Sequence, residues 1–395
     1  MSAQLKFPAI YMRGGTSRGV FFHRKHLPAE RRDWDALFLQ VIGSPDPYGR
    51  QLNGLGVGVS SLSKAVVIGP SEHPQADVDY TFAQIGVGEA TVDYGGLCGN
   101  LTSAVGPFAV DEGLVEASGG EALVRIHNTN THKLIHARFP LVDGQAAVEG
   151  DFVLAGVHGA GARIRLEFKQ PGGSKTGALL PSGRPVNCLA VPGLGEVEVS
   201  LVDASNPVVI VRASDMGVSG VELPEALERD GQLKRRLEAV RAAGAVAMGM
   251  AASARQATRD LKMVPFVAMV APPQDAETLS GERLGLDDVD LTARVISNGQ
   301  AHRAVPLTAG MCLAVAARIE GSLAQQAARP PHGAEADLRL AHPSGVLPVA
   351  ATVTRDDGGW TAEQVVVYRT ARRLMEGAVL VPASAIPAAA ARARA

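Results

Sequence analysis

The segment CGNLTSAVGPFAVDEG, residues 98–113, is a glycine-rich opening to an apolar stretch that closes with Glu-Gly. The segment PLTAGMCLAVAARIEG, residues 306–321, follows the same plan 208 residues further along the chain. Apolar stretches of this length that stop at glycine are typical of buried helices. The repeat therefore predicts two related halves, each with its own strands around an apolar helix. A cleft between two such halves is a usual place for a small ligand.

Short strands punctuated by glycine are predicted on both sides of these helices, because apolar residues alternate or are β-branched and turn residues separate them. In the first half the predicted strands cover residues 7–12, 19–22, 63–68, 78–85, 121–127, 134–140 and 164–168. In the second half they cover residues 196–202, 208–212, 266–271, 347–353 and 363–368. Further helices are predicted at residues 30–42 and 223–259. The pattern indicates an α/β fold.

The domain boundary is predicted at the glycine- and serine-rich stretch 171–183. We therefore expect a first domain at residues 1–183 and a second at 184–382, whose last strands pack back on the first. Residues 383–395 are alanine-rich and are expected to fray.

Composition excludes several classes of protein. The 395 residues are 46% hydrophobic and 20% charged, which is typical of a folded chain. The net charge of −2 and an aromatic content of 4% argue against a nucleic-acid-binding surface. No apolar run is long enough to span a membrane, and the first fifteen residues contain no signal-peptide core. We therefore expect a cytoplasmic protein that binds neither nucleic acid nor membrane.

Lys64 stands in SSLSKAVVIG, at the start of a predicted buried strand. One interpretation is a strand-edge lysine that extends its ammonium into water. The alternative is a partly desolvated amine that acts as a base, because residues 65–68 are apolar and the preceding GLGVGVSS is a loop that can approach a ligand closely. The chain has only eight lysines against thirty arginines, so this lysine is informative.

Cys98 follows two glycines and a leucine and opens the first apolar helix. A helix N-terminus stabilises a thiolate or an oxyanion through its unpaired N–H groups and its positive dipole end. A buried cysteine that packs as a small hydrophobe is an equally good interpretation. Cys312 falls inside the second helix and is predicted to be core, and Cys188 is predicted to pack in a strand or loop. Three scattered cysteines indicate free thiols rather than disulfides or a zinc site.

Polar loops beside these residues are candidate substrate contacts. RGGTSRG, residues 13–19, lacks the spacing of a phosphate-binding loop and fits carboxylate recognition by arginine and loop amides. SNGQAHRA, residues 297–304, is a similar polar segment before the second helix. The candidate substrate-binding residues are Arg13, Gly15, Thr16, Ser17, Arg18, Ser60, Ser61, Gly99, Asn100, Asn206, His302, Thr308 and Ala309.

The histidines His127, His132 and His136 could suggest a metal site. On one continuous strand, however, an odd separation such as 127 to 132 places side chains on opposite faces, and no companion carboxylate is evident. We therefore expect no metal ligands.

The chain resembles the PrpF-type family of 2-methylaconitate cis-trans isomerases and their relatives, 4-oxalomesaconate tautomerase and methylitaconate isomerase, which have the diaminopimelate epimerase-like fold. The resemblance rests on PAIYMRGGTSRGVFF, VIGSPDPYGRQLNG, SSLSKAVVIG, VDYGGLCGNLTSAVGPFAV, SNGQAHRAVPLTAG, HPSG and RTARRLMEGAVLVP, which together span nearly the whole chain. It implies two pseudo-symmetric domains, each a curved, mostly antiparallel sheet or barrel around a central helix, with the active site between them.

The resemblance also implies catalytic roles for Lys64 and Cys98, the two residues selected above. It implies a 1,3-allylic proton shift on a polycarboxylate without metal or organic cofactor, and a homo-oligomer is compatible with it. Related racemases use two facing cysteines, whereas here the second position holds Pro306. Arg18 and Leu97 depart from the lysine and asparagine of many members and are expected to tune substrate choice.

Two alternatives remain at the level of sequence. One is a two-base amino-acid racemase or epimerase that uses Cys98 with another acid or base. The other is a carboxylate-binding protein without catalytic activity.

Overall fold

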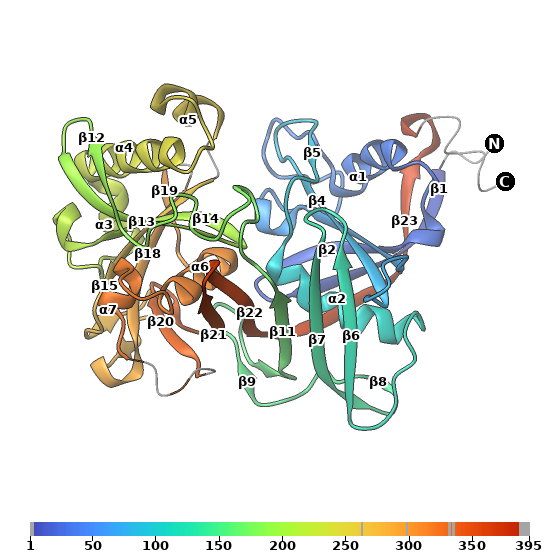
Figure 1. Ribbon diagram of the computed structural model, residues 1–395. Coiled ribbons are helices and arrows are strands. Elements are labelled where there is room, and N and C mark those ends of the chain that lie inside the picture. The colour runs from blue at the N-terminus through green and yellow to red at the C-terminus, as the bar shows by residue number, and fades with distance from the viewer. Residues whose placement is uncertain (1–3, 262–263, 298, 331–332, 334–335, 387–395) are drawn as a thin grey trace. The chain divides into compact units, whose positions relative to one another are not determined.

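The computed structural model describes residues 4–261, 264–297, 299–330, 333 and 336–386 (Figure 1). The chain forms two compact units. The first contains the residues up to Leu166 together with those from Tyr368 onward, and the second contains Glu167–Val367.

The first unit is built on a hairpin and a mixed series of paired strands. β1 (Gln4–Gly14) pairs antiparallel with β2 (Ser17–His23) and with β23 (Ala371–Pro382). β2 runs parallel to β3 (Lys64–Pro70), which is antiparallel to β4 (Val78–Ile85). β4 runs parallel to β6 (Glu121–Asn128), and β6 is antiparallel to β7 (Lys133–Val142). The last strand of the chain thus completes the first unit.

Two helices cover opposite faces of these strands. α1 (Trp34–Ile42) connects β2 to β3, and its apolar residues pack with Val20, Val67 and Ala83. α2 (Gly99–Asp111) follows the short strand β5 (Val92–Asp93) and is almost wholly buried. The ring of Phe21 contacts that of α2 residue Phe108 at 5.9 Å between centroids. Neighbouring residues of a strand point to opposite faces. Alternate side chains of β2, β3 and β4 therefore point toward α1, and the side chains between them point toward α2.

The second unit repeats this order of elements. β13 (Gly195–Ala204) and β14 (Asn206–Arg212) form the hairpin, β14 runs parallel to β15 (Phe266–Ala271), and β15 is antiparallel to β18 (Leu291–Ser297). β18 runs parallel to β20 (Leu338–His342), which is antiparallel to β21 (Gly345–Asp356). α4 (Gly231–Ala247) stands in the place of α1, and α6 (Leu307–Ala316), after β19 (Gln300–Ala301), stands in the place of α2.

The two central helices begin 208 residues apart, α2 at Gly99 and α6 at Leu307. The glycines that follow them, Gly113 and Gly321, both have left-handed backbones, with φ of 68° and 80°. The duplication seen in the sequence is therefore confirmed in structure, and so is the predicted class of two similar α/β halves.

Other elements complete the two units. They are β8 (Gln145–Ala146), β9 (Phe152–Val153), β10 (Ala160–Gly161), β11 (Ile164–Lys169), β12 (Asn187–Val191), β16 (Ala276–Glu277), β17 (Arg283–Leu284), β22 (Gly359–Arg369), α3 (Pro224–Arg229), α5 (Ala254–Asp260) and α7 (Leu323–Ala327). The helical region predicted at 223–259 is thus three helices, because Asp230 caps the start of α4 and residues 248–253 leave the helix. Among the helices described, none is long and apolar enough to cross a membrane.

The segment predicted as a boundary, residues 171–183, belongs to the second unit, and the division falls between Leu166 and Glu167 instead. Buried Asp203 holds this segment: its carboxylate accepts hydrogen bonds from Ser174 Oγ at 2.5 Å and from the backbone N–H groups of Lys175 and Thr176 at 2.8 and 2.7 Å. In the predicted frayed tail, Ile386 is buried against the first unit's core, and residues 387–395 lie outside the described residues.

Candidate active site

Cys98 immediately precedes α2, with extended backbone angles and no side-chain hydrogen bond that caps the helix. Its carbonyl accepts hydrogen bonds from Thr102 Oγ1 at 2.9 Å and from the buried hydroxyl of Tyr80 at 3.3 Å. The thiol itself is half-buried, with Sγ 4.0 Å from Ser17 Oγ. The backbone of Cys98 is thus fixed, while its thiol sits beside the unpaired N–H groups that every helix start carries.

Lys64 is the first residue of β3 and is only 8% exposed. Its ammonium donates a hydrogen bond to Gln84 Oε1 at 2.7 Å and lies 4.9 Å from the ring centroid of Phe82. Gln84 is oriented in turn, because its Nε2 donates to the carbonyls of Ser60 and Ser63 at 3.0 and 3.1 Å. Within the described residues, no carboxylate forms an ion pair with Lys64.

Lys64 and Cys98 lie on the same face of the strands. Phe21 of β2 faces α2, so Gly19 and Ser17, two and four residues earlier, face it as well. The parallel register pairs Val20 with Ala65, which brings Lys64 level with Gly19. Ser17 contacts Cys98, and a Cβ at Gly19 would lie 3.3 Å from that of Lys64. Both predicted catalytic side chains are therefore presented toward the start of α2.

The tip of the β1–β2 hairpin packs directly on the first turn of α2. Asn100 Nδ2 donates to Thr16 Oγ1 at 3.1 Å, and the Thr16 N–H points at Asn100 Oδ1 at 3.5 Å. Gly15 has a φ of 51°, and a Cβ there would lie 2.2 Å from Asn100 Oδ1, so only glycine fits. Gly15, Thr16, Ser17, Gly99 and Asn100 are thus gathered at the start of α2, and their contact with substrate remains a prediction.

Arg13 and Arg18 lie on the other face. They pair with each other across β1 and β2 and share the face of Tyr11, which packs with the α1 core. Arg18 stacks over Tyr11 at 5.8 Å, and Arg13 donates to the Thr370 carbonyl at 3.0 Å. Burial, and the nearby charge of Arg372, lower the pKa of Arg13. Strand alternation therefore separates these two arginines from Lys64 and Cys98, and a role in substrate binding remains a prediction for both.

Ser60 and Ser61 belong to a single 3-10 turn directly before Lys64. Ser60 contributes its carbonyl to Gln84 and is exposed, while Ser61 is half-buried. Their position beside Lys64 agrees with the proximity that the sequence suggested, and contact with substrate remains a prediction.

The candidates of the second unit gather at the start of α6. Asn206 Nδ2 donates to Thr308 Oγ1 at 2.9 Å, and Ala309 is buried in the first turn. His302 Nε2 lies 2.7 Å from Ser297 Oγ, and its ring stands edge-on to Phe266 at 6.1 Å. Burial lowers the pKa of His302, which favours the neutral imidazole.

Comparison of the two units shows what the second one lacks. Phe266 pairs with Val208 at the start of β15, in the place that Lys64 occupies at the start of β3. Pro306 precedes α6 where Cys98 precedes α2. Cys312 is fully buried, as predicted, and burial raises the pKa of its thiol. The second unit therefore presents neither an amine nor a thiol at its corresponding position.

Cys188 is the exposed thiol of the chain, on strand β12, where its Sγ donates a hydrogen bond to Glu196 at 2.5 Å. This hydrogen bond to a carboxylate raises the pKa of the Cys188 thiol. The prediction of strand packing is confirmed for its backbone, but its side chain is not buried.

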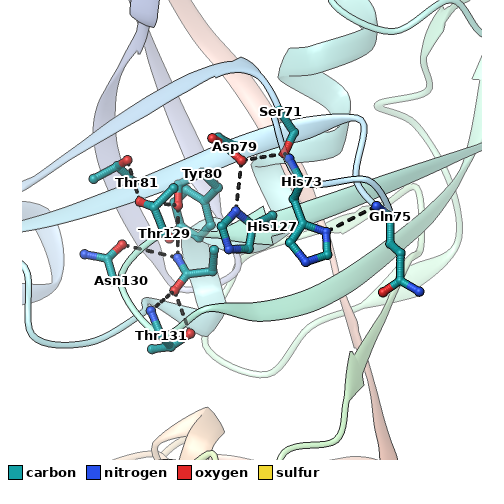
Figure 2. Close-up of polar contacts among 11 residues, drawn as sticks. Ser71, His73, Gln75, Asp79, Tyr80, Thr81, His127, Thr129, Asn130 and Thr131 are labelled. Carbon is teal, nitrogen blue, oxygen red and sulfur yellow. Dashed lines mark hydrogen bonds and ion pairs between the residues drawn. The ribbon is translucent and has the colours of Figure 1, made fainter.

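Three histidines, His73, His127 and His132, cluster beside the β4–β6 pair, and Figure 2 shows the first two. His136 lies on β7 opposite Arg125. His127 Nδ1 lies 2.9 Å from Asp79 Oδ1, and the ring of His73 stacks on that of His127 at 4.9 Å. His132 approaches His127 at 5.9 Å, because it lies in the turn after β6 rather than on one continuous strand. The argument from opposite faces was therefore wrong. In the part of the chain described, no three histidine, cysteine or acidic side chains are placed to hold a metal ion.

Three residues of the first unit were missed by sequence reasoning: Phe82, Gln84 and Arg369. Phe82 and Gln84 share a face of β4 with Tyr80, so alternation could have assigned them to the α2 side once the pairing of β3 with β4 was known. Buried Arg369 donates from Nε to Asn100 Oδ1 at 3.1 Å. It lies among several arginines in RTARR, and no feature of the sequence separates it from the others.

Comparison with known proteins finds relatives that match almost the whole chain. 3-Methylitaconate isomerase of Eubacterium barkeri is 41% identical over 382 residues, covering 96% of this chain and 98% of the relative. 2-Methyl-aconitate isomerase of Shewanella oneidensis is 40% identical over 395 residues, covering 96% and 98%. (4E)-Oxalomesaconate Delta-isomerase of Novosphingobium is 38% identical over 374 residues, covering 95% and 97%.

Two solved structures superpose on this chain and identify its fold. A crystal structure of methylitaconate-delta-isomerase superposes with a TM-score of 0.88 at 40% identity, over 97% of each chain. A hydroxyproline epimerase from Agrobacterium vitis, 13% identical over 99% of each chain, has a TM-score of 0.52 and shares the fold alone. The protein is thus an isomerase with the diaminopimelate epimerase-like fold. Residues 4–382 match the family described as PrpF protein, and the chain belongs to that family.

Proposed function

We propose that this isomerase catalyses a 1,3-allylic proton shift, or the cis-trans isomerisation that results from the same shift, on an unsaturated di- or tricarboxylate. The substrates named for its relatives, methylitaconate, 2-methylaconitate and oxalomesaconate, all carry an alkene next to carboxylate groups. Removal of a proton beside such an alkene gives an anion that is delocalised into a carboxylate. A positioned base and a site for the developing charge are therefore the main requirements.

The observation that carries this proposal is the surroundings of Lys64. A lysine held by a carboxylate must break an ion pair before it can give up its proton, and Lys64 is held instead by a neutral amide and an aromatic ring. Gln84 fixes the direction of the ammonium through its own backbone contacts. Lys64 is thus a buried, oriented amine on the face where α2 begins, which suits a general base.

The proposed reaction conserves atoms and charge. The lone pair of Lys64 Nζ takes a proton from the carbon beside the alkene, and the released electron pair spreads through the alkene into a carboxylate. The resulting dienolate is stabilised by the N–H groups of Gly99 and Asn100 at the positive end of α2. Its far carbon then takes up a proton from the Lys64 ammonium or from the Cys98 thiol. The double bond has moved, and the net charge of substrate and product is the same.

Two sequence-level alternatives gain less support. A racemase that uses two thiols would need a second cysteine at the start of α6, where Pro306 stands. Against a binding protein without activity, the amine of Lys64 is oriented by Gln84 as a general base would be. The named relatives are also isomerases.

The test is proton NMR in deuterium oxide with trans-aconitate, 2-methylaconitate, oxalomesaconate and methylitaconate as substrates. We expect at least one to isomerise, with deuterium entering at the carbons that exchange a proton. Incorporation only at the α-carbon of an amino acid would support the racemase alternative. Binding of these acids without exchange or turnover would support a binding protein.

Two lysine variants test whether Lys64 is the general base. Lys64→Ala is expected to reduce isomerisation by at least about 100-fold, the lower range for loss of general-base catalysis, with an unchanged circular dichroism spectrum. Lys25→Ala, an exposed lysine in the same unit, is the matched control and should retain wild-type activity. Wild-type activity in Lys64→Ala would refute the assignment of Lys64 as the base.

A further inference from the structure

Three arginine side chains are buried in the described part of the chain: Arg241, Arg294 and Arg369. Arg241 forms an ion pair with Glu238 at 2.6 Å, and Arg294 donates to the Glu222 carbonyl at 2.6 Å with the Glu222 charge nearby. A buried arginine is normally accompanied in this way, because a charge removed from water is costly unless an opposite charge or good hydrogen bonds compensate it.

Arg369 is different, because no acidic side chain among the described residues accompanies it. It is 5% exposed, and it donates hydrogen bonds to Asn100 Oδ1 at 3.1 Å and to the Tyr368 carbonyl at 2.8 Å. Both partners are neutral. Burial lowers the pKa of Arg369 to about 10, so the guanidinium is still cationic at neutral pH.

A second arginine, on the following strand β23, provides an internal comparison. Arg373 faces the other end of α2, where it contacts Glu112, Asp111 at 3.9 Å and Glu376 at 3.2 Å. Within the described ranges, acidic side chains therefore accompany the arginine at the C-terminal end of α2, and none accompanies the arginine at its N-terminal end. The N-terminal end already carries the positive end of the helix dipole, which adds to the positive potential around Arg369.

Contacts with the start of α2 and with the hairpin tip fix the side chain of Arg369. Asn100 is the second residue of α2, and its amide is held between Arg369 and Thr16, so that the oxygen faces the guanidinium and the nitrogen faces the hydroxyl. The side chain of Arg369 also passes the hairpin tip, where a Cβ at Gly15 would lie 3.1 Å from its Cδ. The guanidinium, the helix start and a hydroxyl thus converge on one small region.

We propose that the side chains of Arg369, Asn100 and Thr16 form a subsite for one carboxylate of the polycarboxylate substrate. The proposal rests on the function proposed above and names the group that recognises the non-reacting end of that substrate. The substrate carboxylate supplies the negative charge that the protein omits. Arginine suits this role because its planar fork can bind a carboxylate with two hydrogen bonds.

The probe for this subsite is tricarballylate, propane-1,2,3-tricarboxylate, which has three carboxylates and no double bond to move. Isothermal titration calorimetry would measure its Kd for the wild type and for Arg369→Met, Arg369→Lys and Arg372→Met. Arg372 is the control, because it is exposed and lies on the next strand, β23, where it pairs with Arg13 on the face away from α2. Binding is read without turnover, so the result does not depend on Lys64 chemistry.

We expect Arg369→Met to weaken tricarballylate binding by about 10- to 100-fold, the range for hydrogen bonds to a charged group. Arg369→Lys is expected to fall between this variant and the wild type, and Arg372→Met to stay within about twofold, as is usual for a surface change. Unchanged affinity in Arg369→Met, or no measurable binding of tricarballylate to the wild type, would overturn the proposal.

Thermal unfolding without ligand separates this role from a structural one. Arg369→Met removes a buried charge that has no acid beside it, so we expect its Tm to equal or exceed that of the wild type. A large loss of Tm combined with unchanged affinity would assign Arg369 to folding instead. If Lys64→Ala kept its isomerase activity while Arg369→Met lost affinity, the proposed base would fail and the carboxylate subsite would stand.

Discussion

The ammonium of Lys64 donates a hydrogen bond to Gln84 Oε1 at 2.7 Å, and Gln84 Nε2 donates to two backbone carbonyls of the turn that precedes Lys64. The glutamine therefore connects Lys64 to the turn next to it. Because its amide nitrogen donates to carbonyls, its oxygen has one orientation, toward Lys64. We expect Gln84 to position the proposed base.

Gln84→Met should keep the volume of the side chain and remove the hydrogen bond. We expect kcat to fall by about 10- to 100-fold, in line with the loss of a hydrogen bond to a charged group, while KM changes little. Steady-state kinetics would measure kcat and KM, and thermal unfolding would measure Tm. A purely structural role would instead lower Tm and leave the kcat of the folded enzyme unchanged.

Cys98 is expected to return the proton to the dienolate. Its thiol lies on the face of Lys64 and 4.0 Å from Ser17 Oγ. In Cys98→Ala, deuterium exchange at the carbon deprotonated by Lys64 should continue, while product formation falls by at least about 100-fold, as expected for loss of a general acid. NMR in deuterium oxide would follow the two processes separately. Equal losses of exchange and of product would contradict a role in the second step alone.

Burial of His302 is expected to make the free energy of unfolding depend on pH. Burial lowers its pKa in the folded state below the unfolded value of about 6.5, so the unfolded chain binds more protons in that range. The stability contributed by neutral His302 is therefore present above pH 6.5 and is lost as the pH falls toward the folded-state pKa. We expect the decrease in Tm between pH 7 and 5 to be shallower in His302→Gln. Parallel curves for the variant and the wild type would show that His302 does not contribute.

Asp203 is predicted to hold residues 171–183 against the second unit. Asp203→Ala removes the acceptor of two backbone N–H groups and of the Ser174 hydroxyl, and one of the two acceptors of the Thr176 hydroxyl. We expect Tm to fall by several degrees and limited trypsin digestion to cut within this segment, after Lys175. Ser182→Ala, which removes a hydroxyl of the same segment that does not contact Asp203, is the control and should remain resistant. Equal protease resistance of the two variants would refute the prediction.

Part of the fold could be predicted from the sequence because it depends on local patterns. The helix start at Gly99, its counterpart at Leu307 and most strands of the first unit follow from apolar periodicity and from glycine positions. β23 could not be placed in this way, because its partner β1 lies more than 350 residues earlier in the chain. The boundary near residue 183 also failed, because a glycine-rich segment resembles a linker until the carboxylate that binds it is known.

The candidate site likewise has features that follow from local sequence and features that follow only from strand pairing. The sequence by itself determined that Lys64 begins an apolar strand and that Cys98 begins a glycine-flanked helix, because both properties depend on neighbours in the chain. Only the tertiary structure decided that these two side chains share a face, that Arg13 and Arg18 lie on the other, and that Gln84 contacts Lys64 and Arg369 contacts Asn100. These relationships depend on which strands pair and in which register, and register converts positions far apart in sequence into neighbours on one face.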